Sequence, residues 1–176
     1  MGLLEDLGYG VKSPNGLQRG MQAFSSSRTG AWMFSKTMYP VDKALFRVTG
    51  GRLTLASLTA GLPVIVLITT GARSGKARTM PLVGIPVGDD LAVIGSNYGQ
   101  TSTPGWVYNL EADPSATVRY RDRTVAVTAR RADEDETDQT FDLAAGVYPG
   151  YAKYRTRADH RVIRVFVLES ATSTNP

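Results

Sequence analysis

The stretch at residues 64–82, VIVLITTGARSGKARTMPL, organises the rest of the chain. Residues 64–68 are apolar and mostly β-branched, which predicts a short buried strand. A compact cationic turn follows, made of Arg73, Ser74, Gly75, Lys76 and Arg78. Residues 79–87 predict a second strand. The turn therefore offers backbone amides, a hydroxyl and three cations beside an apolar sheet.

This cationic turn predicts an anion site, with phosphate as the expected anion, because flexible glycine backbone and Arg or Lys donors suit phosphate oxygens. A solvated hairpin loop is the alternative, since Lys and Arg are usually exposed. The turn does not match the nucleotide-binding pattern G-x-x-x-x-G-K-[ST]. Gly71 and Gly75 are one residue too close, and Ala77 stands where the Mg²⁺-binding hydroxyl would be, which disfavours ATP chemistry.

The composition excludes several kinds of site. The chain has 176 residues, 42% of them apolar, and no cysteine, which fits one globular domain without disulfides, thiolate catalysis or cysteine zinc sites. A single histidine, His160, rules out a histidine-rich metal centre and disfavours a Ser-His-Asp triad. The acidic residues 133–138 fit the first turn of an exposed helix better than a metal site, because the helix dipole favours negative charge there. We therefore expect no metal.

The whole net charge of +4 comes from residues 1–60, which contain seven basic and three acidic residues. The rest of the chain contains 13 basic and 13 acidic residues, so its charges balance. A basic amino-terminal part favours an anionic partner, such as a membrane surface or an acidic cofactor tail. The balanced remainder has no extended basic stripe, so we expect no nucleic-acid partner. The chain has no apolar run of about 18 residues and its start does not resemble a secretory signal, so we expect a cytoplasmic protein.

Residues 1–39 predict a flexible or amphipathic amino-terminal segment, because residues 2–30 are rich in Gly, Ser and Asn. After Pro40, apolar residues at helical spacing predict an amphipathic helix: Val41, Ala44, Leu45 and Val48. Its basic face fits either packing on the core or peripheral membrane contact through residues 28–52, at the inner face of the plasma membrane. Residues 40–170 predict a single domain, and residues 171–176 a frayed tail.

The remaining pattern alternates short strands with two helices. Strands are predicted at residues 64–68, 79–87, 91–96, 116–120, 124–131 and 161–168, mostly joined by hairpin turns. One helix is expected between Pro104 and Asp113, and another after the acidic residues 133–138. The predicted fold class is α+β, with a six-stranded, mostly antiparallel sheet curled into a barrel and flanking helices.

Two further groups of residues are candidates for function. Four lie in the loop after the third strand and in the helix that follows: Ser96, Asn97, Trp106 and Asn109. Tyr148, Tyr151 and Tyr154 recur at a spacing of three, roughly along one helical face. Such a stripe usually packs against a core with its hydroxyls at the rim, and it also suits a lid over an aromatic or quinoid ligand.

The order of these motifs resembles the deazaflavin-dependent nitroreductase family. The matching motifs are TTGARSGKARTMPL, GSNYG, PGWVYNLEADPSATV and YPGYAKY before RVIRVFVLE, within residues 40–169. The ordered set is much more specific than the basic turn alone. The resemblance implies a split β-barrel, related to FMN-binding pyridoxamine-phosphate-oxidase-like proteins. It also implies the deazaflavin coenzyme F-420, found mainly in actinobacteria and methanogenic archaea.

The resemblance also implies where the coenzyme lies. Its phosphate and acidic tail would contact Arg73, Ser74, Gly75, Lys76 and Arg78. The deazaflavin ring would contact Thr79, Met80, Pro81, Ser96, Asn97, Trp106 and Asn109. The substrate side would be lined by Tyr148, Tyr151 and Tyr154. Val83 stands where the family commonly has an aromatic residue, which leaves reduction of nitroimidazoles open.

The implied activity is hydride transfer from the reduced deazaflavin to a menaquinone-like quinone, an enone or a nitroaromatic acceptor. The protein must then hold the ring against an electrophilic carbon and donate a proton or hydrogen bond to the developing oxyanion. Tyr151 is the expected donor and Ser96 the second candidate, with Tyr148 and Tyr154 shaping the pocket. The alternatives are an FMN-dependent oxidoreductase in the same barrel and a non-catalytic deazaflavin carrier. Related barrels often form homodimers, which is a further expectation here.

Overall fold

The structure is a computed structural model that describes residues 2–10, 16, 62–97, 100–152 and 162–171. The predicted helix after Pro40 and the predicted membrane-contact segment at residues 28–52 lie outside the described residues, as do Tyr154 and His160. Within the described part of the chain, no helix is long and apolar enough to cross a membrane.

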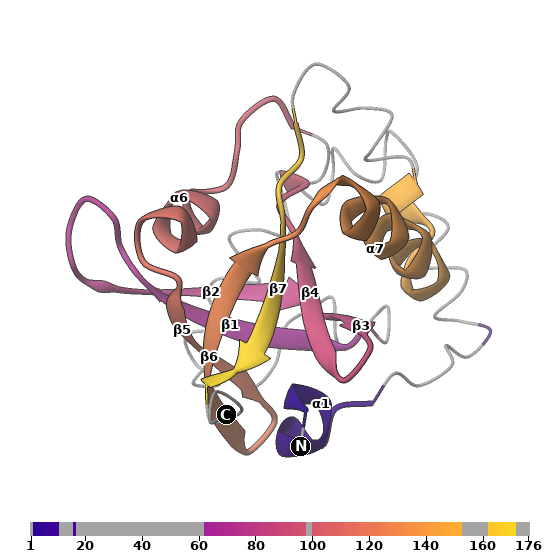
Figure 1. Cartoon of the computed structure of the whole chain (residues 1–176), viewed down its shortest axis with the longest axis horizontal. Coiled ribbons are helices and arrows are strands. Elements are labelled where there is room, and N and C mark those ends of the chain that lie inside the picture. Colours follow the sequence, from indigo (N-terminus) through magenta and orange to yellow (C-terminus); the bar gives the residue numbers. More distant parts are fainter. Residues whose placement is uncertain (1, 11–15, 17–61, 98–99, 153–161, 172–176) are drawn as a thin grey trace.

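In the described part of the chain, seven strands form one sheet, and every neighbouring pair is antiparallel. The strands are β1 (Val64–Thr70), β2 (Ala77–Val83), β3 (Ile85–Val87), β4 (Asp90–Ile94), β5 (Ser115–Tyr120), β6 (Arg123–Arg131) and β7 (Val165–Ser170). The helices whose full length lies within the described residues are α1 (Leu3–Leu7), α6 (Gly105–Ala112) and α7 (Glu134–Val147). The order of the strands in the sheet is β2-β1-β5-β6-β7-β4-β3, as Figure 1 shows.

The sheet curls on itself because its two edge strands are consecutive in the chain. β2 and β3 stand at opposite ends of the strand order, yet only Gly84 separates them. Val83 pairs with Val64 of β1, whereas Ile85 pairs with Ala92 of β4. This geometry confirms the predicted antiparallel split barrel. It corrects the predicted strand count from six to seven, because residues 79–87 form two strands with different partners.

Gly84 stands at this joint because no side chain fits there. A Cβ at Gly84 would lie 2.9 Å from the hydroxyl oxygen of Tyr9 and 3.3 Å from Cδ2 of Leu91. The Tyr9 hydroxyl lies 2.6 Å from the carbonyl oxygen of Gly84 and 3.0 Å from that of Pro63, and it donates to them. A residue near the amino terminus therefore holds the joint between the two edge strands.

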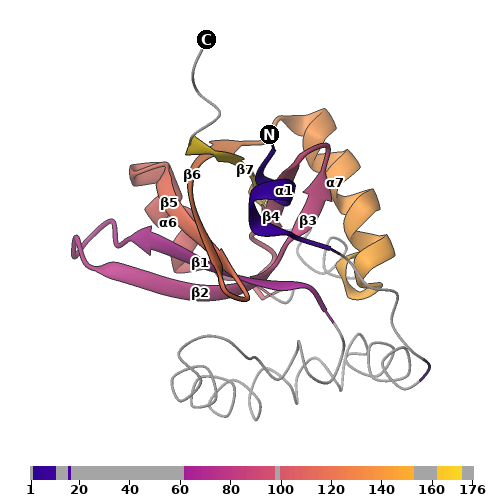
Figure 2. The ribbon, with the colours of Figure 1, turned by 90° about the horizontal axis from the view of Figure 1, so that it is seen from below.

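Alternation along the strands produces two apolar clusters, because successive side chains point to opposite faces of a sheet. On β7, Phe166 and Leu168 belong to the cluster inside the barrel, while Val165 and Val167 belong to the cluster beneath α7. Figure 2, seen from the α1 end, shows α6 and α7 on opposite sides of the barrel. The strands thus separate an interior core from a second core covered by α7.

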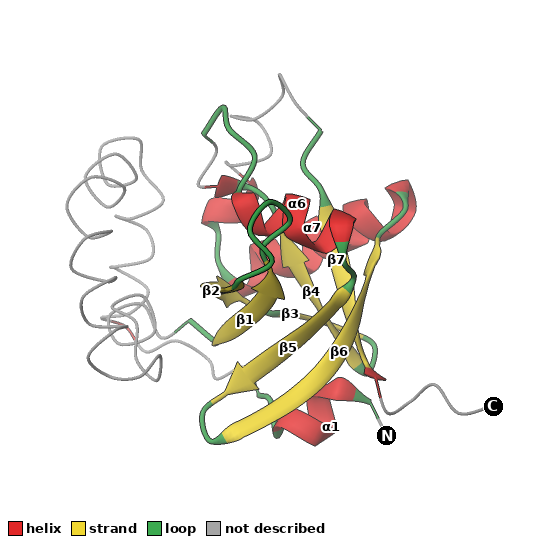
Figure 3. Ribbon diagram, turned by 90° about the vertical axis from the view of Figure 1, so that its left-hand side faces the viewer, coloured by secondary structure: helices red, strands yellow, loops and turns green. Residues whose placement is uncertain are grey.

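Helix α1 packs against the end of the barrel opposite α6 and α7 (Figure 3). Leu3 and Leu7, one helical turn apart, are almost fully buried in the interior cluster. The helix ends at Gly8, whose φ of +58° is the left-handed conformation of a C-cap. The sequence predicted no helix at this position; the proposed boundary near residue 39 stays a prediction.

The acidic residues 133–138 begin α7, as the exposed-helix interpretation expected. The Asp133 side chain accepts from the backbone N–H of Glu136, and the Glu136 side chain accepts from the N–H of Asp133, which together make a capping box. No group of three or more acidic or histidine side chains among the described residues is placed to hold a metal ion.

Candidate functional site

The basic turn between β1 and β2 projects from one side of the barrel, at the left of Figure 1. The Gly71 carbonyl accepts from the N–H groups of Ser74 and Gly75 at 3.1 and 2.8 Å, and the Gly71 N–H donates to the Lys76 carbonyl at 2.9 Å. Gly75 has a φ of +62°, which favours glycine. A Cβ at Gly71 would lie 2.7 Å from Ser74 Oγ, so close approach requires glycine there too.

Asn109 connects this turn to α6. Its Oδ1 accepts from the backbone N–H of Ala72 at 3.0 Å, and its Nδ2 donates to Oγ1 of Thr69 at 2.9 Å. Thr69 is only 3% exposed at the end of β1. Asn109 therefore holds the start of the turn and the end of the strand in one arrangement. Its predicted contact with a ring system stays a prediction.

The three cations of the turn are Arg73, Lys76 and Arg78, and all are exposed. None of them forms an ion pair with any other residue in the described part of the chain. Ser74 Oγ accepts from Nη2 of Arg78 at 3.3 Å and from the backbone N–H of Lys76 at 3.4 Å. As far as the described residues go, the turn thus presents positive charge without a paired carboxylate, together with hydrogen-bond donors, which is the chemistry that binds an oxyanion.

Strand β2 carries Thr79, Met80 and Pro81, the residues predicted to run along a ring. Burial increases along β2, whose first three residues are exposed and whose last four are half-buried. Met80 packs against the interior cluster, and Pro81 is tolerated because β2 is an edge strand that pairs only with β1. The half-buried part of β2, residues 80–83, therefore follows the basic turn closely in the chain.

Ser96 and Asn97 follow β4. Ser96 is 6% exposed. Asn97 has a φ of +47°, and its Nδ2 donates to the backbone oxygen of Ser102 at 3.0 Å and to its Oγ at 3.1 Å. The Asn97 carbonyl accepts from the N–H of Gln100 at 3.0 Å. Asn97 therefore closes the loop that leads into α6.

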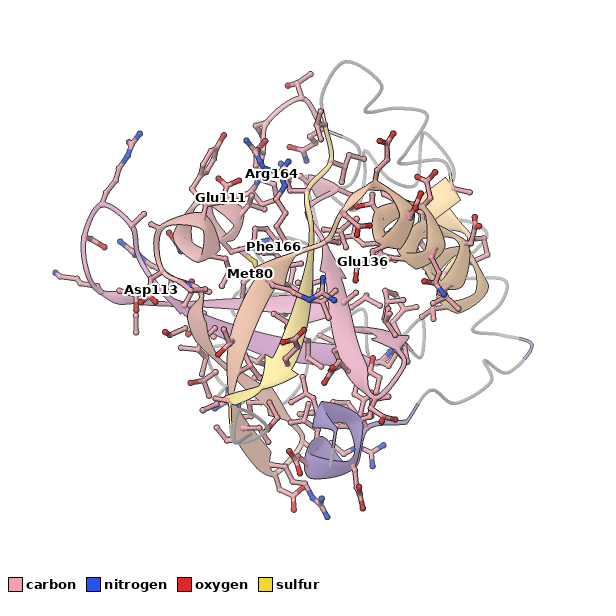
Figure 4. The ribbon with its side chains drawn as sticks, viewed as in Figure 1. Met80, Glu111, Asp113, Glu136, Arg164 and Phe166 are labelled. Carbon is pink, nitrogen blue, oxygen red and sulfur yellow. The ribbon has the colours of Figure 1, made fainter. Side chains whose placement is uncertain are left out.

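Trp106 lies in the interior core. It is 4% exposed, and its ring meets Phe166 of β7 edge-on, with a centroid separation of 6.0 Å and an interplanar angle of 64°. Figure 4 labels Phe166 near the centre of the barrel. The structure thus gives Trp106 a packing role, and its predicted contact with a bound ring stays a prediction.

Tyr148 and Tyr151 do not share a helical face, which corrects the prediction from their spacing. Helix α7 ends at Val147, and Tyr148 has an extended φ of −149°. The residue that follows, Pro149, lacks the N–H that a helix interior needs. The rings of Tyr148 and Tyr151 instead meet edge-to-face, 6.0 Å apart at 86°, and are 6% and 7% exposed. The structure brings these tyrosines together in the cluster beneath α7.

Tyr9 is a further tyrosine that the sequence did not point to, and it packs against the interior cluster. Burial raises the pKa of Tyr9 above its ordinary range, and the phenols of Tyr120 and Tyr151 raise that pKa further. The Tyr9 ring lies 4.7 Å from that of Tyr120. Tyr9 therefore stays protonated as a donor to the carbonyls at the barrel joint. Its partners lie 54 and 75 residues away in the chain, so no local sequence signal identifies it.

Arg164 is another residue that sequence reasoning missed. Its Nε lies 2.7 Å from Oε1 of Glu111, and the two side chains point toward each other between β7 and α6 in Figure 4. The sequence placed Arg164 in a predicted strand and gave it no functional role. An isolated Arg in a strand pattern carries no signal of its distant partner.

Comparison with known proteins identifies related chains. Residues 39–170 match a family model described as F420H(2)-dependent quinone reductase. Two proteins of Mycobacterium tuberculosis strains, F420H(2)-dependent quinone reductases Rv1261c and MT1299, are each 30% identical to this chain over 95 residues. That match covers 54% of this chain and 63% of each relative, so this chain spans less than two thirds of the relatives' length.

Two solved structures resemble this chain. One, described as F420-H2 Dependent Reductase (FDR-A), is 36% identical with a TM-score of 0.56, covering 61% of this chain and 94% of that one. The other, described as a domain-swapped dimer, is 32% identical with a TM-score of 0.58, covering 81% of this chain and 100% of that one. Both likenesses support the barrel fold.

Proposed function

The chain belongs to the F420H(2)-dependent quinone reductase family, and from this membership we propose that it reduces quinone-type acceptors with the reduced deazaflavin coenzyme F-420. The observation that carries the proposal is the basic turn. Its three exposed cations have no carboxylate partner among the described residues, and Asn109 holds the turn to α6. Such a preorganised positive loop fits the anionic tail of this coenzyme.

The residues present fit that group. Arg73, Lys76 and Arg78 would bind the phosphate and the carboxylates of the tail. The open space around the left-handed Gly75, where a Cβ would meet nothing within 4 Å, lets an anion approach the backbone. The half-buried stretch of β2 that includes Met80 then offers an apolar surface to a flat ring.

The reaction itself divides between coenzyme and protein. When bound, the reduced deazaflavin supplies a hydride to an electrophilic carbon of the acceptor. The protein then has to donate a proton or hydrogen bond to the oxygen that gains charge. We propose Tyr151 for this role, because its side chain is only 7% exposed and hydrogen bonds are stronger in such a buried environment. Ser96 is the second candidate donor, and Tyr148, edge-to-face against Tyr151, would hold the phenol in position.

Binding is tested by titrating the protein with oxidised and reduced coenzyme and following the fluorescence of the deazaflavin. We expect saturable binding at micromolar concentrations, weakened by salt because the tail contacts are ionic. A matched titration with FMN tests the alternative cofactor. A yellow purified protein with a flavin spectrum, and no response to the deazaflavin, would overturn the proposal in favour of FMN.

The acceptor is proposed to be a quinone of the menaquinone type, with enones and nitroaromatic compounds as further candidates. Val83 is half-buried against the cluster beneath α7, and it is smaller than the aromatic residue that the family resemblance leads one to expect there. A panel of the three acceptor classes, compared by kcat/KM, separates them. Tight coenzyme binding without acceptor-dependent turnover would instead support a non-catalytic carrier.

Two further properties remain proposals: a homodimer, and peripheral membrane contact through residues 28–52. One similar structure is described as a domain-swapped dimer, which supports the first. Light scattering on the purified full chain measures its oligomeric state. Co-sedimentation with vesicles of anionic and of neutral phospholipids tests the second, and equal absence from both pellets would reject membrane contact.

A further inference from the structure

Arg164 joins three segments that meet beside Ser96. Its Nε pairs with Oε1 of Glu111 at 2.7 Å, and its Nη1 lies 3.4 Å from Oγ1 of Thr103. Its guanidinium carbon lies 5.7 Å from the centre of the Tyr108 ring. One side chain ahead of β7 thus contacts both helix α6 and the loop that precedes it.

The main chain of Arg164 makes a further contact with the strand end that carries Ser96. The Arg164 carbonyl accepts from the N–H of Gly95 at 2.9 Å. A Cβ at Gly95 would lie 2.9 Å from Cγ2 of Val107 and 3.0 Å from the Arg164 oxygen. The end of β4, helix α6 and the start of β7 therefore touch at a point with no spare room, so a shift of α6 is felt at Ser96.

The Arg164–Glu111 pair is partly shielded from water, with 27% and 32% of the two side chains exposed. Tyr108 and Glu111, three residues apart on α6, present one face of the helix to the guanidinium. On the same helix, Asn109 contacts the basic turn through the backbone N–H of Ala72. Helix α6 is thus fastened to the turn by Asn109 and to Arg164 by Tyr108 and Glu111, and the main chain of Arg164 binds Gly95, next to Ser96.

We propose that Arg164 is a positioning residue that fixes the Ser96–Asn97 loop relative to the basic turn, through α6. This inference rests on the proposed function, because it assigns the turn to the coenzyme's tail and the Ser96 loop to its reacting end. Loss of the guanidinium frees the loop while the turn, with its own bonds to Asn109, keeps its arrangement. The coenzyme then stays bound by its tail, and the catalytic step slows because the reacting end is less well held.

The experiment compares Arg164→Met with Arg130→Met. Arg130 is a matched control: it also forms a network of ion pairs, with Glu136 and Glu169 at 2.6 and 2.8 Å, at the α7 side of the sheet. Two properties are measured. The first is the exchange rate of the Gln100 amide, followed by NMR on the protein without coenzyme. The second is the change in kcat compared with the change in the coenzyme dissociation constant. The Gln100 N–H donates to the Asn97 carbonyl, so its exchange reports on the loop.

For Arg164→Met we expect Gln100 amide exchange to accelerate about tenfold. We also expect kcat to fall about tenfold with a coenzyme dissociation constant changed less than about threefold. Arg130→Met should lower the melting temperature similarly and leave both readouts unchanged. Equal behaviour of the two variants would overturn the positioning role. If Arg164→Met does not fold, Glu111→Gln, which keeps the guanidinium and removes its charged partner, is measured by the same two readouts and decides the question.

Failure of the proposed function gives a different result. A wild-type protein that binds no deazaflavin rejects the coenzyme assignment, whatever Arg164 does. The amide exchange of Gln100 is measured without coenzyme, so it still shows whether Arg164 holds the loop. Unchanged exchange in both Arg164→Met and Glu111→Gln would reject the inference alone.

Discussion

The side-chain oxygen of Asn109 accepts a hydrogen bond from the backbone N–H of Ala72 at 3.0 Å, which fastens the basic turn to helix α6. The amide nitrogen of the same side chain donates to Thr69 at 2.9 Å. One residue therefore sets where the first strand ends and where the cationic loop begins. A loop held in this way loses less conformational entropy when it binds an anion.

Replacing Asn109 by Ala should weaken coenzyme binding more than it destabilises the protein. Both hydrogen bonds are lost, which costs about 1–2 kcal/mol of folding free energy at this partly buried site. Coenzyme affinity should fall about tenfold, because the turn must then be ordered during binding. Fluorescence titration and thermal unfolding measure the two effects. Gln139→Ala, an exposed amide on α7, is the control, and an equal loss of affinity there would contradict this role of Asn109.

Neutralising the turn should lower affinity in a salt-dependent manner. Arg73→Ala, Lys76→Ala and Arg78→Ala each remove one exposed cation, and each should weaken coenzyme binding about three- to tenfold at low salt. Arg78→Ala should have the largest effect, because Ser74 Oγ also loses a donor. Exposed Arg131 at the end of β6 supplies the control, Arg131→Ala. Affinities that do not respond to ionic strength would be inconsistent with a site for the anionic tail.

The strand pattern was predictable wherever it depended on local alternation. The apolar run at residues 64–68 became β1, and the hairpin signals gave the antiparallel order. The break at Gly84 was not predictable, because it follows from the closing of the barrel and from Tyr9, whose oxygen lies 2.6 Å from the Gly84 carbonyl oxygen across 75 residues. Helix α1 was missed for the same reason, since five residues form a helix there only by packing on the barrel.

The candidate site was predictable as a set of residues and not as a set of contacts. Motifs identified Arg73, Ser96 and Asn109, because glycine turns and polar loops stand out from apolar strands. Nothing in the sequence pairs Asn109 with Ala72, or Arg164 with Glu111, since such partners are chosen by the packing of α6 on the barrel. The burial of Trp106 against Phe166 likewise depends on residues far apart in the chain.

Tyr9→Phe should destabilise the fold at the barrel joint. The ring remains, but the carbonyls of Gly84 and Pro63 lose their donor, at a cost of about 1–3 kcal/mol. A protein of this size should lose about 2–4 °C in melting temperature per kcal/mol. Tyr108→Phe, whose residue is 50% exposed, is the matched control. A melting temperature equal to that of the wild type would show that the Tyr9 hydroxyl does not stabilise the joint.

Stability should depend on pH through Glu136. Hydrogen bonds from Arg130 and from the Asp133 backbone lower the pKa of Glu136 from 4.5 to about 2. The ionised carboxylate therefore stabilises the folded state fully above about pH 4.5, and this contribution is lost as the pH falls toward 2. Because the pair with Arg130 is partly exposed, we expect about 1 kcal/mol.

Glu136→Gln tests this contribution. The wild type should exceed the variant in unfolding free energy at neutral pH, and the difference should shrink below about pH 4.5. Glu134→Gln, which removes an exposed carboxylate from the same first turn of α7, controls for the helix dipole. A difference that stays constant down to pH 2.5, well below the unfolded pKa, would contradict the account of Glu136.

The most direct test of the proposed reductase activity is the oxidation of the reduced deazaflavin by menaquinone, followed through the fluorescence of the oxidised coenzyme. The reduced coenzyme should be oxidised only when the quinone and the wild-type protein are both present. Tyr151→Phe should bind the coenzyme normally while losing about a hundredfold in kcat. A wild-type protein that binds the reduced coenzyme tightly, and shows no quinone-dependent oxidation, would contradict the account.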